Sequence, residues 1–515
     1  MGKKEFIFLL LLVLAALFIR GFFLSQVRMI FPDEAYYLGM ARSMAEGRDY
    51  AGFDPTPFQR TETNLGRHQG QPFLPVLLSW TTRAGKDPVL AGQWTSVAAS
   101  ILALILFHFC VRHFGTPGEA LVSDAVYVFS PVAIRYSYLV MNHSLFFLFL
   151  FAFLLFALKA AASGRLTFAV LAGVAAWGAY LTRLEAIFLV GLLVLFTIFL
   201  PLTPTLSSSG GEGRVRGVKF FLIGIFVTSF LLLCLPVWVW IRKTTGIWQL
   251  DWSLTQGVPA YLVASRAGFP GLQAFWPAYF HRLGESLWTA VKVFPAALLV
   301  LVGPGVLEVF SRKKPETPLP FLILPFVVFP FLFYPAVNND PRFYAPALLF
   351  LYLFAGPGVS FLIRKIKRRK AVVLGCLLLA PVSFFPGYRS LVLGFGQEPL
   401  EQKKMGEWIA QNYAEPQVIL VSDIRSCFYA GPRCRRRFSP LRMKEEMAAG
   451  RLTFERFLEK NQIDLIAVDL NTVEKFHPHA LFLLNDPPAF LKKAVEWDGE
   501  KQRIVLYQYD PGRQP

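Results

Sequence analysis

The feature that most constrains this sequence is a series of long apolar stretches running from the N-terminus to about residue 385. A helix crosses the bilayer core with about 20 apolar residues, and about eleven stretches approach that length. The predicted spans are 6–27, 89–111, 120–138, 145–158, 166–181, 187–202, 220–240, 287–310, 319–336, 344–363 and 371–385. Only 17% of all residues are charged, against about 25% in soluble domains. A purely soluble protein is therefore excluded.

The basic residues predict the orientation of these spans. The net charge is +18, which alone would fit nucleic acid, anionic lipid or a topology signal. If the N-terminus is cytoplasmic, 17 Lys and Arg residues fall in the inner loops, as the positive-inside rule requires. The first outer loop balances its charges, and no basic stripe for nucleic acid is evident. The first stretch lacks a signal-peptide cleavage site and is predicted to be a retained helix.

The chain divides into two predicted domains. Residues 1–395 form the membrane domain, with an outer loop at 28–88 that contains an amphipathic helix, and a flexible, low-complexity cytoplasmic loop at 203–217. Residues 396–515 form a small extracytoplasmic α/β domain, because an odd number of spans places the C-terminus outside. Its predicted strands are 418–421, 465–468 and 504–507, and its predicted helices are 403–413, 454–461 and 480–484. Cys427 and Cys434 lie in this domain, where a disulfide is plausible.

Polar residues gather at the predicted outer ends of the spans, where functional groups of membrane proteins are often found. The candidates are Asp33, Glu34, His68, Asn142, His143, Arg183, Glu185, Arg342 and Tyr344. Structural explanations stay open for each of them. Asp33 could be a helix N-cap, Arg183 could pair with Glu185, and Arg342 could extend towards the interface. His68 could be an ordinary loop residue, and the stretch that includes Asn142 and His143 could be an interfacial anchor.

The set is more informative than its members, because carboxylates and two arginines are predicted to face the same compartment. Arginine is suited to binding a phosphate or pyrophosphate. A carboxylate is suited to removing a proton from a hydroxyl. Together they indicate group transfer from a phosphate-linked donor at a membrane surface.

On these motifs the sequence resembles the GT-C glycosyltransferases that use polyprenyl-phosphate sugars, in particular the bacterial aminoarabinose-transferase-like and protein O-mannosyltransferase-like enzymes. The resemblance covers residue 1 to about residue 389, and the small C-terminal domain is similar to that of many bacterial members. The motifs that carry it are Asp33-Glu34, His68 to Pro72, Thr182-Arg183 and Arg342-Phe343-Tyr344. The expected fold is an α-helical polytopic membrane protein of GT-C type with a C-terminal α/β domain.

The resemblance implies a role for each matching residue. Asp33 would be the general base with Glu34 beside it, Arg183 and Arg342 would hold the lipid phosphate, and His68 would line the cavity. Many relatives carry a second acidic residue where this chain has Asn142-His143, so a divalent cation stays undecided. The implied partners are a polyprenyl-phosphate-linked sugar, an acceptor lipid, glycan or protein, and membrane lipids. The implied location is the plasma (inner) membrane.

Two other functions stay open at this point. A transporter or flippase for a lipid-linked sugar would use polar groups near mid-membrane and inverted repeats, whereas the polar groups here gather at one surface. A non-catalytic scaffold would not explain the arginines and the Asp33-Glu34 pair. The sequence therefore favours an enzyme, and the resemblance implies an inverting glycosyltransferase.

Overall fold

The computed structural model describes most of the chain and divides it into two compact units. The described residues are 1–27, 29–47, 72–183, 186, 191, 212–245, 280–281, 283–285, 296–312, 344–366, 400–438, 440–448, 453–499 and 502–510. One unit, here called the helical unit, holds the described parts of Met1–Gln26, Thr63–Leu74 and Leu90–Phe395. The other, here called the sheet unit, holds those of Val27–Glu62, Pro75–Val89 and Gly396–Pro515.

Three described helices are long and apolar enough to cross a membrane. They are α1 (Lys3–Gln26), α5 (Pro88–Phe114) and α8 (His143–Ser163). A fourth span is possible if α17 (Ala345–Tyr352) and α18 (Ala355–Ile366), which meet at a bend of 41°, are counted as one. Since the predicted stretches at 319–336 and 371–385 lie outside the described residues, the count of about eleven stays a prediction.

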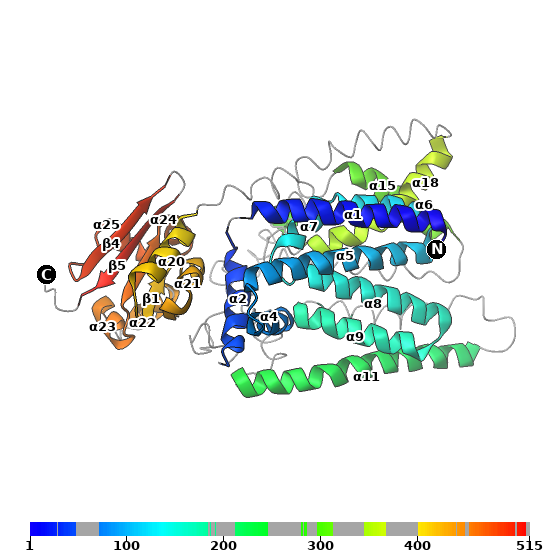
Figure 1. Ribbon diagram of the computed structural model, residues 1–515. Helices are drawn as coiled ribbons and strands as arrows, with labels where there is room; N and C mark the ends of the chain where they lie inside the picture. Colours follow the sequence, from blue (N-terminus) through cyan, green and yellow to red (C-terminus); the bar gives the residue numbers. More distant parts are fainter. Residues whose placement is uncertain are drawn as a thin grey trace. The chain divides into compact units, whose positions relative to one another are not determined.

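The helices of the helical unit pack in two groups. In one, α8 packs against α9 (Leu166–Thr182), and α9 packs against α11 (Glu212–Thr245), as Figure 1 shows. In the other, α18 packs against both α15 (Ala296–Ser311) and α6 (Pro117–Val128). Gly305 and Gly358 allow the close approach of α15 and α18, because a Cβ at either position would overlap a backbone carbonyl of the facing helix.

Two sequence predictions need correction here. The single span predicted at 120–138 is two helices, α6 and α7 (Pro131–Tyr138). Pro131 explains the break, because proline lacks the N–H that would continue the helix, and Ser130 instead caps α7 by accepting from the Ala133 N–H. The flexible loop predicted at 203–217 is partly helical, since α11 begins at Glu212. The rest of that loop lies outside the described residues.

A charged group of four side chains joins three helices of the helical unit. Arg312 donates from Nε to Glu308 Oε1 at 2.8 Å and from Nη1 to Glu119 Oε2 at 2.9 Å. Arg364 pairs with the other oxygen of Glu308. The two carboxylates are almost fully buried, at 2% and 4% exposure. We call these four residues the ion-pair cluster.

The C-terminal part of the sheet unit contains a five-stranded mixed sheet. Its strands are β1 (Gln417–Val421), β2 (Cys434–Phe438), β3 (Leu465–Asp469), β4 (Leu491–Asp498) and β5 (Arg503–Tyr509), in the spatial order β2-β1-β3-β5-β4. β1 pairs in parallel with β2 and β3, and β5 runs antiparallel to β3 and β4. The three strands predicted from sequence are confirmed, whereas the two edge strands β2 and β4 were not predicted.

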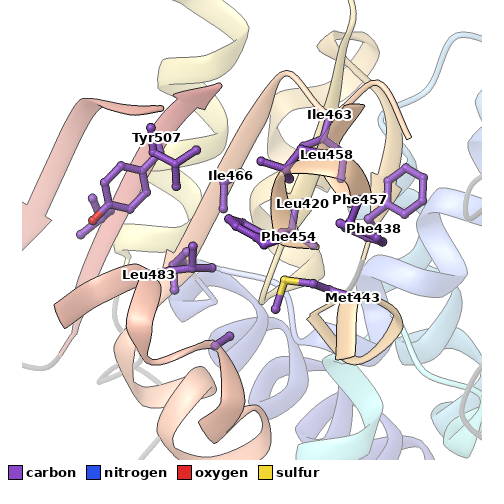
Figure 2. Packing of buried hydrophobic residues seen from close by; sticks show 14 of the residues in the cluster. Leu420, Phe438, Met443, Phe454, Phe457, Leu458, Ile463, Ile466, Leu483 and Tyr507 are labelled. Carbon is purple, nitrogen blue, oxygen red and sulfur yellow. The ribbon is translucent and has the colours of Figure 1, made fainter. Parts of the chain in front are cut away.

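Two hydrophobic clusters cover opposite faces of this sheet, because successive strand side chains point to opposite faces. On one face, Leu420 and Ile466 pack with Phe457 of α23 (Phe454–Lys460), as Figure 2 shows. On the other, Ile419 and Leu465 pack against α20 (Glu401–Asn412) and α21 (Ile424–Ala430). The predicted helices at 403–413 and 454–461 correspond to α20 and α23. The one predicted at 480–484 is instead a 3-10 turn, η7 (Pro478–Ala480), followed by the short α25 (Phe482–Asn485).

Candidate active site

Arg183 and His143 lie 40 residues apart in the sequence, and the structure brings them together in the helical unit. Arg183 follows the last residue of α9, in an extended conformation, and its side chain is buried. Its Nη1 lies 2.7 Å from Nε2 of His143, the first residue of α8. The guanidinium also lies over the Phe146 ring, 5.7 Å from its centroid. We call the hydrogen-bonded residues the Arg183–His143 pair.

The surrounding backbone holds this pair in place. The His143 ring stacks on Tyr136 of α7, with centroids 4.3 Å apart and planes within 10°. Ser144 donates to the Tyr136 carbonyl at 2.7 Å, which ties the start of α8 to α7. On the other side, Thr182 donates to the Ala179 carbonyl at 2.7 Å, and the Arg183 N–H bonds to the same carbonyl. Both ends of the contact are thereby positioned by secondary structure.

The hydrogen bond of the pair defines the state of the imidazole. A guanidinium can only donate hydrogen bonds, so the His143 Nε2 must accept, which requires the neutral imidazole. This contact therefore leaves the positive charge of Arg183 undiminished. A buried cation in surroundings of low dielectric interacts strongly with an anion, and the planar guanidinium fits a phosphate in a bidentate manner.

The Asp33-Glu34 motif lies in the first turn of α2 (Pro32–Ala45), which belongs to the sheet unit. Phe31 is the residue that precedes the helix, so Asp33 is not the N-cap. Glu34 is fully buried, and its Oε2 accepts from the Phe31 N–H at 2.6 Å. Asp33 is partly exposed. Of the two carboxylates, Glu34 thus stabilises the start of the helix and Asp33 is the more accessible.

Of the remaining candidate residues, two are described by the structure and three are not. Asn142 and Tyr344 are both buried and precede α8 and α17 respectively. His68, Glu185 and Arg342 lie outside the described residues. Their predicted roles, and the alternative pairing of Arg183 with Glu185, stay predictions.

A metal site was left undecided by the sequence. Within the described part of the chain, no group of three or more His, Cys, Asp or Glu side chains is arranged to hold a metal ion.

The sequence analysis missed a cluster of polar side chains near the C-terminal end of α5. The His108 Nδ1 forms a hydrogen bond of 2.6 Å with Oδ2 of Asp124. On the other side of the ring, Nε2 lies 3.3 Å from Oε1 of Glu5, which pairs with Arg112 at 2.6 Å. These residues come from three separate segments of the sequence, so the sequence gave no signal of their proximity. The same holds for the Arg183–His143 pair, whose members were singled out in separate motifs.

Comparisons with known proteins identify the fold. No family model and no curated protein sequence matches the chain. Among solved structures, the oligosaccharyltransferase AglB from Archaeoglobus fulgidus, in complex with an inhibitory peptide and a dolichol-phosphate, has a TM-score of 0.58 at 13% identity, over 100% of this chain and 75% of that chain. ArnT from Cupriavidus metallidurans, bound to undecaprenyl phosphate, has a TM-score of 0.55 at 14% identity, over 98% of each chain.

These likenesses cover nearly the whole chain, both helices and sheet. The chain therefore has the fold of the GT-C glycosyltransferases, and the resemblance that the sequence motifs indicated is confirmed. At such low identity the likeness establishes the fold alone, because one fold can host different functions.

Proposed function

We propose that this protein is an integral membrane glycosyltransferase that moves a sugar from a polyprenyl-phosphate donor to an acceptor hydroxyl on a lipid, glycan or protein. The reaction takes place on the extracytoplasmic face of the plasma membrane, with the N-terminus in the cytoplasm. The observation that carries this proposal is the buried Arg183–His143 pair within a GT-C fold. Two solved proteins of similar fold were captured with dolichol-phosphate and with undecaprenyl phosphate, which supports a lipid phosphate as part of the donor.

In the proposed reaction, Asp33 accepts the proton of the acceptor hydroxyl while that oxygen attacks the anomeric carbon of the sugar. The bond between the anomeric carbon and the phosphate oxygen breaks, and the polyprenyl phosphate leaves as an anion. Arg183 stabilises the charge that develops on the phosphate, and Arg342 is proposed to assist. Since the leaving phosphate needs no proton, one base is enough, unlike in ordinary glycoside hydrolysis. A single displacement inverts the anomeric configuration.

The remaining candidates are proposed to support this chemistry. His143 orients the Arg183 guanidinium through its hydrogen bond, and Asn142 precedes it at the start of α8. Glu34 stabilises the first turn of α2, which carries Asp33. His68, Glu185 and Tyr344 are proposed to contact the substrate.

The experiment is transfer of radiolabel from a polyprenyl-phosphate sugar to an acceptor by the purified protein in proteoliposomes. We expect Asp33→Asn to lower kcat by about 10²- to 10⁴-fold, the usual contribution of a general base. The matched control is Glu46→Gln, which removes an exposed carboxylate just beyond the end of the same helix and should leave kcat unchanged. Near-normal transfer by Asp33→Asn would refute the assignment of the base.

The same assay tests the alternative of a flippase. A flippase would move the label between leaflets while it stays on the polyprenyl phosphate. The transferase instead releases unlabelled polyprenyl phosphate and a labelled acceptor of inverted anomeric configuration.

A further inference from the structure

Within the sheet unit, the helix that carries Asp33 is held by the C-terminal domain. The Ile30 N–H, three residues before Asp33, donates to the Tyr429 hydroxyl at 3.0 Å. The next N–H, that of Phe31, is bound by Glu34. Two successive amides at the start of α2 are thus fixed, one by the helix itself and one by the domain some 400 residues later in the chain.

A second set of contacts holds the side of α2. Arg437 of β2 donates from Nη1 to the Tyr36 hydroxyl at 2.9 Å and lies over the Tyr36 ring, 5.5 Å from its centroid. Six residues further along the helix, Arg42 lies 5.0 Å from the centroid of the Phe428 ring. The contacts extend from Ile30, just before α2, to Arg42 in its last turn, so they restrain both the position of the helix and its rotation about its axis.

The residues that make these contacts lie in or just beyond one disulfide loop. Cys427 and Cys434 are bonded to each other, as the sequence made plausible. Phe428 and Tyr429 lie between them, and Arg437 follows three residues after Cys434. The bond links α21 to β2 directly and so restricts the backbone that presents these side chains to α2. Burial, followed by the nearby Glu34 carboxylate, raises the pKa of Tyr429 to about 12, so its hydroxyl stays neutral under ordinary conditions.

We propose that the C-terminal domain positions the catalytic helix: Tyr429 and Arg437, held by the Cys427–Cys434 disulfide, fix α2 so that Asp33 is presented in the orientation for proton transfer. The proposal rests on the proposed function, in which Asp33 is the base. Tyr429 and Arg437 are positioning residues that act through α2 and have no direct role in the chemistry.

The first test compares Tyr429→Phe with the control Tyr413→Phe, in the full-length protein in nanodiscs. Tyr413 follows α20 in the same domain, and its ring packs on Trp408. Its substitution by Phe also removes one hydroxyl, but at a position away from the Ile30 N–H. We expect amide hydrogen exchange in residues 29–46 to be about tenfold faster in Tyr429→Phe, as fits the loss of one hydrogen bond. Exchange in β1 and β3 should be unchanged, and the control should match the wild type throughout.

Kinetics then separate positioning from a purely structural role. We expect Tyr429→Phe to lower kcat about tenfold while the KM for the polyprenyl-phosphate sugar stays the same, because the donor phosphate is bound by other residues. Faster exchange in 29–46 with an unchanged kcat would overturn the proposal, and so would unchanged exchange. If the wild type transfers no sugar at all, the proposed function fails, and the exchange experiment still decides whether the domain holds α2.

A double-mutant cycle tests the second contact. Arg437→Gln and Tyr36→Phe each remove one side of the same hydrogen bond, so the double variant should exchange in 29–46 no faster than the more affected single variant. Additive effects would show that the two residues act independently and would contradict the role given to Arg437.

The disulfide is tested by reduction. Once mass spectrometry confirms that the bond is reduced, the wild type should show the same faster exchange and lower kcat as Cys427→Ala/Cys434→Ala. The double alanine variant should not respond to reductant. Unchanged amide exchange in the reduced wild type would show that the disulfide is not needed to hold α2 in place.

Discussion

Two arginines of the helical unit, the partly exposed Arg312 and the buried Arg183, have very different surroundings. Arg312 lies between the carboxylates of Glu119 and Glu308, and Arg364 adds a second positive charge to the cluster. Arg183 instead contacts the imidazole of His143 and the face of the Phe146 ring. Both arginines are bound to neighbours, but the neighbours differ in their chemistry: carboxylates contact Arg312, and an imidazole and an aromatic ring contact Arg183.

The difference fits the roles assigned to the two residues, a structural one for Arg312 and, in the proposed function, a phosphate-binding one for Arg183. In the ion-pair cluster the charges of opposite sign neutralise one another, and removing one member leaves buried charges uncompensated. In the Arg183–His143 pair the neutral imidazole orients the guanidinium without cancelling its charge. In the proposed reaction, the charge of Arg183 meets the phosphate of the lipid donor.

The largest expected effect is on catalysis at Arg183. We expect Arg183→Ala to lower kcat/KM by about 10²- to 10³-fold, because the charge on the leaving phosphate loses its stabilisation. Transfer of radiolabelled sugar in proteoliposomes measures this. The control is Arg165→Ala, which removes an exposed arginine at the opposite end of the same helix. If Arg183→Ala lowers stability and leaves the transfer rate of the folded protein unchanged, Arg183 has a structural role like that of Arg312, and the proposed difference between the two arginines is wrong.

The second effect is on stability at Arg312. We expect Arg312→Gln to lower the free energy of unfolding by about 3 kcal/mol, since the buried Glu119 loses its ion pair with Arg312 and Glu308 is left with Arg364. The folded fraction should keep its kcat and KM. Thermal unfolding of the protein in detergent measures the change, with Arg83→Gln as a control on an arginine that binds only a backbone carbonyl in an exposed contact. Unaltered thermal stability would show that the cluster does not have the structural role inferred here.

The smallest effect sharpens the role of His143. We expect His143→Phe to lower kcat/KM about tenfold, because it keeps a ring against Tyr136 but removes the acceptor of the Arg183 hydrogen bond. His143→Gln retains an acceptor and should lose less. Steady-state kinetics of the two variants give the answer. A larger loss in His143→Gln than in His143→Phe would mean that the stacking of the ring, and not the hydrogen bond, is what matters.

The degree to which the sequence predicted the fold depended on the signal in each segment. The strands at 418–421, 465–468 and 504–507 are continuous apolar runs, and they are buried in the sheet as predicted. β2 contains Arg435, Arg436 and Arg437, and charged residues are typical of edge strands, so its sequence carried no strand pattern. The break at Pro131 could have been predicted from proline chemistry, but the apolar character on both sides concealed it.

The candidate site was predictable only in its parts. Arg183, His143, Asp33 and Glu34 were all recognised as costly polar residues beside apolar stretches. That His143 would meet Arg183 was not predicted, because their contact depends on how α8 packs against α9. The hydrogen bond from the Ile30 N–H to the Tyr429 hydroxyl joins positions 399 residues apart. No local sequence pattern could reveal such a contact.

By itself, the sequence determined that the chain lies in a membrane and that its C-terminal part is a small α/β domain. It also identified the polar residues that are candidates for a functional site. These are local properties, since hydrophobic length and residue type follow directly from the order of amino acids. Only the tertiary structure decided which of these residues are neighbours. A hydrogen bond acts over about 3 Å, and the chain folds back many times before two distant side chains come within that range.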